Sequence, residues 1–190
     1  MAYHHGNLRA ELLARAETVL AEGGVEALSL RSLARDLGVS HAAPARHFPD
    51  RQALLDALAV EGFGRLGAEV AKAASSGESF EDRLTEAALV YVRFATQHSV
   101  LLDVMYARKH REPTAELRAA SDACAAILLG LFTGREAAVD DPERFSVILL
   151  ATLHGIAALA ASRSLPPAHD PDDLVVDTVR RLLRGSRGGA

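Results

Sequence analysis

The stretch SLRSLARDLGVSHAAPARHFPDR, Ser29–Arg51, decides how the rest of the chain is interpreted. Its first part has one apolar helical face, made of Leu30, Leu33, Ala34 and Leu37. Gly38 then supplies a turn residue that tolerates positive φ. Ser40 is a favourable N-cap for a second helix, which we expect to close on Phe48. Two short helices that cross at a glycine-bearing turn form a helix-turn-helix, whose second helix enters the major groove of DNA.

A wider set of residues carries a family resemblance: Leu33-Ala34, Leu37-Gly38-Val39-Ser40, Arg46-His47-Phe48 and Arg51-Gln52-Ala53-Leu54-Leu55. With them, the first third of the chain resembles the tetracycline-repressor (TetR-like, AcrR) family of transcriptional regulators. The resemblance implies a helix-turn-helix DNA-binding domain at residues 1–52 and a ligand-binding and dimerisation domain at residues 53–190. No strand pattern or repeat is present, so we expect an all-α fold of about nine helices.

Helical spacing and capping signals place the remaining elements. We expect helices at 8–21, at 51–74, from the capping-box sequence at Ser79, at 100–106, from Glu112-Pro113-Thr114 to about Phe132, at 142–164 and at 171–184. Asn7 is the expected cap of the first helix, and residues 1–6 are an arm that we expect either near the phosphate backbone or partly disordered.

The net charge of −4 means that DNA contacts must come from a local basic surface and not from bulk charge. The lone Cys124 excludes an internal disulfide and suits a reducing cytoplasm. The longest apolar zone, residues 147–161, is interrupted by Thr152, His154 and Gly155, so we expect no membrane span.

Pro44 and Ala45 stand where the family usually has Leu and Tyr. Pro44 removes a hydrogen bond to the Ser40 carbonyl and biases Ala43 away from the helical region. We expect Arg46 and His47 to contact mainly phosphate, and His41 with the alanines to meet the groove floor. The resemblance places Arg51 at the family's phosphate-binding lysine position. The predicted DNA-binding residues are Arg31, Ser40, His41, Ala42, Ala43, Ala45, Arg46, His47 and Arg51. For Arg31, a solvated surface arginine is an equally good interpretation.

Residues 147–161, VILLATLHGIAALAA, are apolar nearly all round, which a small domain can accommodate only if one face meets another partner. The simplest partner is a second copy of the chain. In TetR-like proteins the last two helices of each subunit build a four-helix dimer interface, and these helices resemble them. The predicted interface residues are Ala151, Gly155, Ala158, Val175, Val179 and Leu182.

His154-Gly155 resembles part of the subgroup named for Trp, His and Gly, although the chain has no Trp and Leu150 stands at its place. A lone His on an apolar helix is either a hydrogen-bonded core residue or part of a ligand cavity. Bulky, soft or polar side chains among aliphatic helices suit a mostly apolar pocket. The predicted ligand-binding residues, each with core packing as the alternative, are Tyr91, Phe94, His98, Met105, Tyr106, Cys124 and His154.

These features predict a homodimeric repressor that binds a palindromic DNA operator and is released by a small, mostly apolar ligand. An enzyme is disfavoured because no metal-ligand spacing, glycine-rich phosphate loop or nucleophile–base set is present. We accordingly expect no cofactor and no metal. The third interpretation is a helical adaptor that uses the same fold without DNA.

Overall fold

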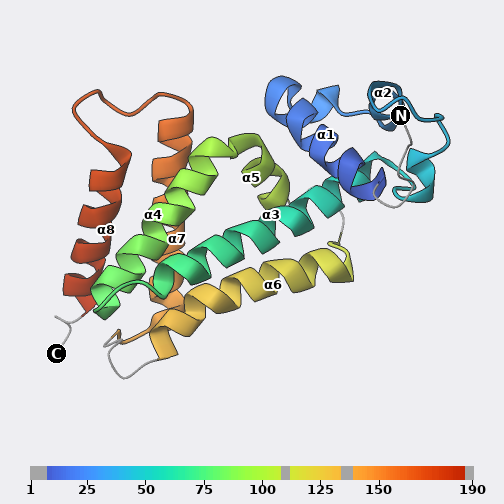
Figure 1. The fold of residues 1–190 in the computed structure, drawn as a ribbon. Helices are drawn as coiled ribbons and strands as arrows, with labels where there is room; N and C mark the ends of the chain where they lie inside the picture. Colours follow the sequence, from blue (N-terminus) through green and yellow to red (C-terminus); the bar gives the residue numbers. More distant parts are fainter. Residues whose placement is uncertain (1–7, 108–111, 134–138, 187–190) are drawn as a thin grey trace. The chain divides into compact units, whose positions relative to one another are not determined.

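The computed structural model describes residues 8–107, 112–133 and 139–186, and within these ranges the chain forms eight α-helices, three 3₁₀ helices and no strand (Figure 1). The all-α prediction is confirmed. The structure has one α-helix fewer than the nine we expected, because the second helix of the helix-turn-helix is replaced by a 3₁₀ turn. The arm, Asn7 and the last four residues lie outside the described ranges.

The chain divides into two compact units. Unit 1 consists of Met1–Gly62 with Val100–Arg118, and unit 2 of Phe63–Ser99 with Ala119–Ala190. The predicted functional division at residues 52 and 53 is a separate question and stays a prediction.

Unit 1 contains α1 (Leu8–Gly23), η1 (Val25–Ala27), α2 (Leu30–Asp36), η2 (Pro44–Arg46), the first half of α3 (Arg51–Ala74) and most of α5 (Ser99–Tyr106). Its core is mostly aliphatic, with Phe48 and Met105 added. Ala34, which the sequence placed on the apolar face of α2, is fully buried. Gly38 turns the chain at φ 66°, a conformation that L side chains rarely adopt.

Unit 2 is built around α4 (Phe80–Gln97), α7 (Pro142–Ala161) and α8 (Pro171–Ser186), whose backbones pack closest together. The later part of α6 (Ala115–Gly130) and η3 (Leu131–Thr133) complete it, with the second half of α3. Phe132 of η3 makes edge-to-face contacts with Phe80 and Phe145, at ring-centroid distances of 5.7 and 5.3 Å. Ion pairs between Arg93 and Asp172 (2.6 Å) and between Arg180 and Glu81 (3.4 Å) join α4 to α8.

Capping signals set the helix starts where the sequence predicts them. The Asp50 carboxylate accepts from the Ala53 N–H at 2.8 Å, and the Asp141 carboxylate accepts from the Arg144 N–H at 3.0 Å. At α4, the N–H of Asp82 donates to Ser79 Oγ, and the N–H of Ser79 donates back to the Asp82 carboxylate, both at 3.1 Å. Hydrogen bonds from the Ser79 side chain and backbone lower the pKa of Asp82. The predicted capping box is therefore confirmed.

Candidate nucleic-acid interface and ligand cavity

The reading segment, residues 40–47, is a turn followed by the 3₁₀ helix Pro44–Arg46 and not an α-helix. The prediction of a second helix capped by Ser40 is wrong. Pro44 has no N–H to bond the Ser40 carbonyl, which accepts instead from the Ala43 N–H at 2.9 Å. The Pro44 carbonyl in turn accepts from the N–H groups of His47 and Phe48, both at 2.9 Å. The segment is thus a hydrogen-bonded turn over residues 40–43 that continues into one turn of 3₁₀ helix.

Ala43 has φ −65° and ψ −44°, which is the helical region that we expected Pro44 to disfavour. The restriction before proline is a bias and not a prohibition. Pro44 is buried and occupies the first position of a 3₁₀ helix, where a backbone N–H is dispensable. Burial of the ring therefore outweighs the local preference of Ala43.

The reading segment exposes most of the side chains that we predicted as DNA contacts. Seven of these side chains are exposed and Ala43 is half-buried; the exposed ones are Arg31 in the first turn of α2, Ser40, His41, Ala42, Ala45, Arg46 and His47. Phe48 is 2% exposed and anchors the segment, with the Arg9 guanidinium 5.6 Å from its ring centroid. The outward face therefore combines small side chains with two arginines and two histidines.

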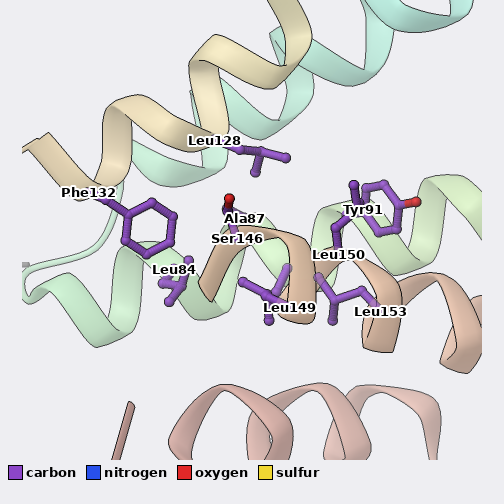
Figure 2. Close-up of a pocket in the computed structure, with 10 residues that line it drawn as sticks. Leu84, Ala87, Tyr91, Leu128, Phe132, Ser146, Leu149, Leu150 and Leu153 are labelled. Carbon is purple, nitrogen blue, oxygen red and sulfur yellow. The ribbon is translucent and has the colours of Figure 1, made fainter. Parts of the chain in front are cut away.

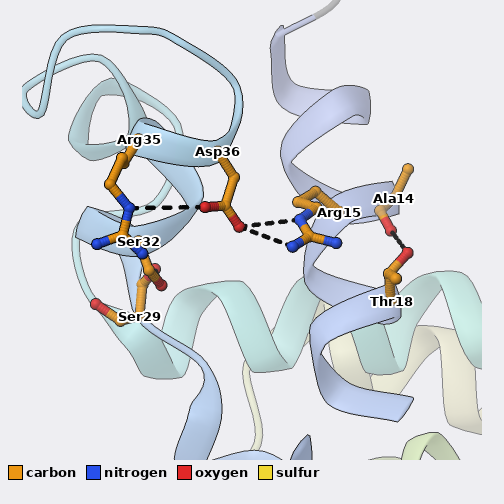
Figure 3. A network of polar contacts seen from close by, with 7 residues as sticks. All are labelled: Ala14, Arg15, Thr18, Ser29, Ser32, Arg35 and Asp36. Carbon is orange, nitrogen blue, oxygen red and sulfur yellow. Dashed lines mark hydrogen bonds and ion pairs between the residues drawn. The ribbon is translucent and has the colours of Figure 1, made fainter. Parts of the chain in front are cut away.

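The Asp36 carboxylate forms ion pairs with two arginines, Arg15 of α1 and Arg35 of α2 (Figure 3). Asp36 accepts from Nε and an Nη of Arg15 at 3.0 and 2.9 Å, and it lies 3.8 Å from Arg35. This contact fastens α1 to α2 and neutralises Asp36. Among the described residues, Arg31 and Arg46 have no carboxylate within ion-pair distance, so their charges remain available to phosphate.

Arg51 is held inside unit 1. Its guanidinium donates to the Val25 carbonyl and lies 3.6 Å from the Glu26 carboxylate, and its Nε is buried without a hydrogen-bond partner. Arg51 therefore fastens η1 to the start of α3, which argues against the predicted phosphate contact. The sequence could not reveal this, because the partners lie 26 residues apart.

Unit 2 contains a narrow cavity between α4, the end of α6 with η3, and α7 (Figure 2). Its volume is about 20 Å³, room for about one water molecule. The lining residues are Leu84, Ala87, Ala88, Tyr91, Leu128, Phe132, Ser146, Leu149, Leu150 and Leu153. The sequence could not separate most of these residues from ordinary core, because aliphatic side chains serve both purposes.

Of the seven predicted ligand residues, only Tyr91 lines this cavity. Its hydroxyl lies 3.1 Å from His154 Nδ1, so His154 is one hydrogen bond away from the lining. The prediction that the remaining residues line a pocket is not supported for this cavity: Phe94, His98, Met105, Tyr106 and Cys124 lie elsewhere.

Those residues have other contacts. The rings of Phe94 and His98 lie 4.8 Å apart. Met105 belongs to unit 1 and Tyr106 is 39% exposed. Cys124 packs beside α3, and burial raises the pKa of its thiol. The contacts and exposure of these five residues are therefore those of ordinary core or surface residues.

The outer face of α7 is exposed and apolar. The predicted interface residues Ala151, Gly155 and Ala158 lie on it. The larger residues on the same face are Val147 (62% exposed), Ile148 (42%) and Leu159 (48%). Among the described helices, α7 is the one long and apolar enough to cross a membrane by length and composition alone, and only 22% of its most apolar window is buried.

The α8 residues of the predicted interface fall into two groups. Val175 and Val179 are 0% exposed within the single chain, so they are core residues and leave the predicted interface. The periodicity of the helix correctly marked them as inward-facing, but the inward side meets this chain's own core, where α8 packs on α4 and α7. Leu182 is half-buried and keeps surface for a partner.

Comparisons with known proteins match both halves of the chain. A family model described as "Bacterial regulatory proteins, tetR family" matches residues 12–58, and one described as "Tetracyclin repressor-like, C-terminal domain" matches residues 84–182. A protein of unknown function from Rhodococcus sp. RHA1 is 42% identical, with 98% of each chain covered and a TM-score of 0.88.

More distant structures share the fold. The fatty acid degradation regulator FadR from Bacillus halodurans is 16% identical, with 95% of this chain and 98% of that chain covered and a TM-score of 0.74. The TetR family regulator PfmR from Thermus thermophilus is 21% identical, with 91% and 97% covered and a TM-score of 0.66. A search of curated proteins gives no match.

Proposed function

The chain belongs to the TetR family of transcriptional regulators with a helix-turn-helix DNA-binding domain, and on that premise we propose that it is a cytoplasmic homodimeric repressor, which binds a palindromic operator and is released by a small, mostly apolar ligand. We assign DNA binding to residues 1–52, and ligand binding and dimerisation to residues 53–190. Membership of the Trp-His-Gly subgroup stays a prediction.

The observation that carries the proposal is the exposed apolar face of α7. Val147, Ile148 and Leu159 expose large side chains to water along one helix, with the small residues Ala151 and Gly155 between them. Contiguous apolar surface of this kind is typical of an interaction site. A second copy of α7 is the simplest cover, and a stable dimer needs about 800 Å² buried on each partner. Leu182 of α8 extends the proposed contact.

Dimerisation also supports DNA binding by a domain of low net charge. Two reading segments related by two-fold symmetry, spaced by about one DNA turn of ~34–36 Å, contact two half-sites of a palindrome. In each half-site we assign phosphate contacts to Arg31 and Arg46. His47 supports them, and His41 with Ala42 faces the groove floor, where alanine methyls pack on thymine methyls. The turn presents fewer side chains than a full recognition helix, so we expect few base contacts per half-site.

Ligand release follows from thermodynamic linkage. A ligand can dissociate the repressor only by binding its DNA-incompetent form more tightly than its DNA-bound form. The cavity, at about 20 Å³, is far smaller than the ~300–1,000 Å³ of ordinary ligand sites. A bound ligand therefore requires an opened form of unit 2 in which the cavity is wider. The difference in ligand affinity between the opened and the closed form is what couples ligand binding to DNA release.

The experiment that tests this function is capture of genomic DNA fragments by the purified protein, followed by sequencing. We expect a small set of palindromic sites, and affinity that falls steeply with salt because phosphate contacts release counterions. Replacing Arg31 and Arg46 together with alanine should abolish capture while the dimer stays folded. Failure of the wild-type protein to retain any fragment at low salt would contradict the proposal and favour the adaptor.

A further inference from the structure

Arg9 is an exposed arginine of unit 1 whose charge has no counter-charge in the described part of the chain. It is the second residue of α1, and its guanidinium carbon Cζ lies 5.6 Å from the centroid of the Phe48 ring. Among the described residues, no carboxylate lies within ion-pair distance of Arg9. The guanidinium is therefore held by an aromatic ring and keeps its full positive charge.

The position of Arg9 in α1 is unfavourable for a cation. The first turn of an α-helix has unsatisfied N–H groups, whose partial positive charge favours acidic side chains such as Glu11 and disfavours arginine. At an exposed site, the attraction between a guanidinium and an aromatic ring is about as large as this penalty. The stability of α1 therefore does not explain an arginine at this position.

Phe48 brings the Arg9 guanidinium close to the reading segment. Phe48 directly follows His47, and the centroids of these two rings lie 6.5 Å apart. Because Phe48 is only 2% exposed, its ring is a fixed support for the long Arg9 side chain. Contact with the ring restricts that side chain before DNA binds, so less conformational entropy is lost on binding, and the guanidinium N–H groups stay available as donors.

Arg51, three residues after Phe48, is at the family's phosphate-binding position, but its guanidinium is held by η1. We propose, on the basis of the function above, that Arg9 supplies a phosphate contact beside the reading segment in place of Arg51. Because Arg9 belongs to α1 and not to the reading segment, we assign it to the DNA backbone. Contacts to the backbone position a protein on the duplex without reading its sequence.

The test compares, in the full chain, Arg9→Gln, which removes the charge, with Arg9→Lys, which keeps it. Fluorescence anisotropy over a salt series measures binding to a DNA fragment captured by the wild-type protein and to a scrambled duplex of the same length. Arg9→Gln should weaken binding to both duplexes at least about tenfold and reduce the salt slope by about two per dimer, whereas Arg9→Lys should keep the slope. A wild-type slope in Arg9→Gln overturns the inference, and a loss confined to the captured fragment overturns the assignment to phosphate.

Arg35→Gln is the matched control, because it removes an exposed arginine of the same unit that lies 3.8 Å from the Asp36 carboxylate. It should reduce the slope less than Arg9→Gln does, and an equal reduction would mean that only the net charge of unit 1 matters, which overturns the inference. Thermal unfolding tests the alternative of a structural arginine: Arg9→Gln should stay folded, and an unfolded variant overturns the inference. Absence of DNA binding by the wild-type protein contradicts the proposed function, whereas wild-type binding that Arg9→Gln leaves unchanged overturns the Arg9 contact alone.

Discussion

Replacing Gly155 with alanine adds one methyl group to the exposed face of α7, and the sign of its effect depends on what covers that face. In the single chain, a Cβ at Gly155 meets no atom within 4 Å, and the same holds for Gly64 in the interior of α3. Both glycines are exposed and lie within long helices. Without a partner, each Gly→Ala substitution should stabilise the protein by about 0.5–1 kcal/mol through helix propensity.

If α7 forms the dimer interface, we expect Gly155→Ala to destabilise the dimer, whereas Gly64→Ala should still be stabilising. Small residues allow two helices to approach closely, and an added methyl at such a contact costs about 1–3 kcal/mol through overpacking. An isologous interface contains the contact twice, so the dimer loses about 2–6 kcal/mol. The dimer dissociation constant should then rise about 30-fold or more.

Sedimentation equilibrium over a range of protein concentrations measures the dimer dissociation constant, and thermal unfolding measures the stability of each variant. Gly64→Ala is the control, which should raise stability and leave association unchanged. The reasoning is refuted if Gly155→Ala associates as tightly as the wild-type protein and gains the same stability as the control. In that case α7 would face water or a looser contact.

Four further predictions follow from side chains already described. Arg46→Ala should weaken DNA binding and reduce the slope of log affinity against log salt by about two per dimer, and fluorescence anisotropy over a salt series measures both quantities. The control is Arg184→Ala, at an exposed arginine in the last turn of α8, which should change neither. Arg51→Ala should lower the free energy of unfolding by about 1–2 kcal/mol in denaturant titrations, because the Val25 carbonyl loses a charged donor. Asp82→Asn should destabilise the protein at pH 7. Because the folded-state pKa of Asp82 lies below its ordinary 3.8, this deficit should persist above that value and vanish as the pH falls through the lowered pKa; equal pH dependence of the two proteins would contradict it. Cys124 should react with iodoacetamide much more slowly in the folded than in the unfolded protein at pH 8, because burial raises its pKa and leaves little thiolate; equal rates would place the thiol at the surface.

Local signals in the sequence predicted the helices well because those signals are also local in the structure. The cap at Asp141 and the capping box at Ser79 each join residues three apart, so the pattern and the contact coincide. The start and end of α3 at Arg51 and Ala74 were predicted on the same grounds. Pro44 was recognised as an obstacle to the second helix, but the sequence alone did not show that its burial would draw Ala43 into a tight turn.

The functional residues were harder to predict where their partners are distant in sequence. Arg51 has the right position for phosphate, yet its guanidinium is committed to η1, which only the fold brings near. Val175 and Val179 lie on the correct apolar stripe of α8, but a stripe does not say whether it faces its own core or a partner. The cavity is lined by leucines from three parts of the chain, and Tyr91 was found only because it is aromatic and polar at once.

If the proposed effector binds only an opened form of unit 2, the small cavity also sets a concentration threshold for that effector. When a binding-competent form is rarely populated, the apparent dissociation constant equals the intrinsic one divided by that population. With the opened form at about 1%, an effector of micromolar intrinsic affinity is sensed only at about 0.1 mM. In the proposed repressor, traces of the compound would then leave the regulated genes silent, and expression would begin only once the compound has accumulated. A cavity that must open before it binds would in this way act as a filter against background metabolites.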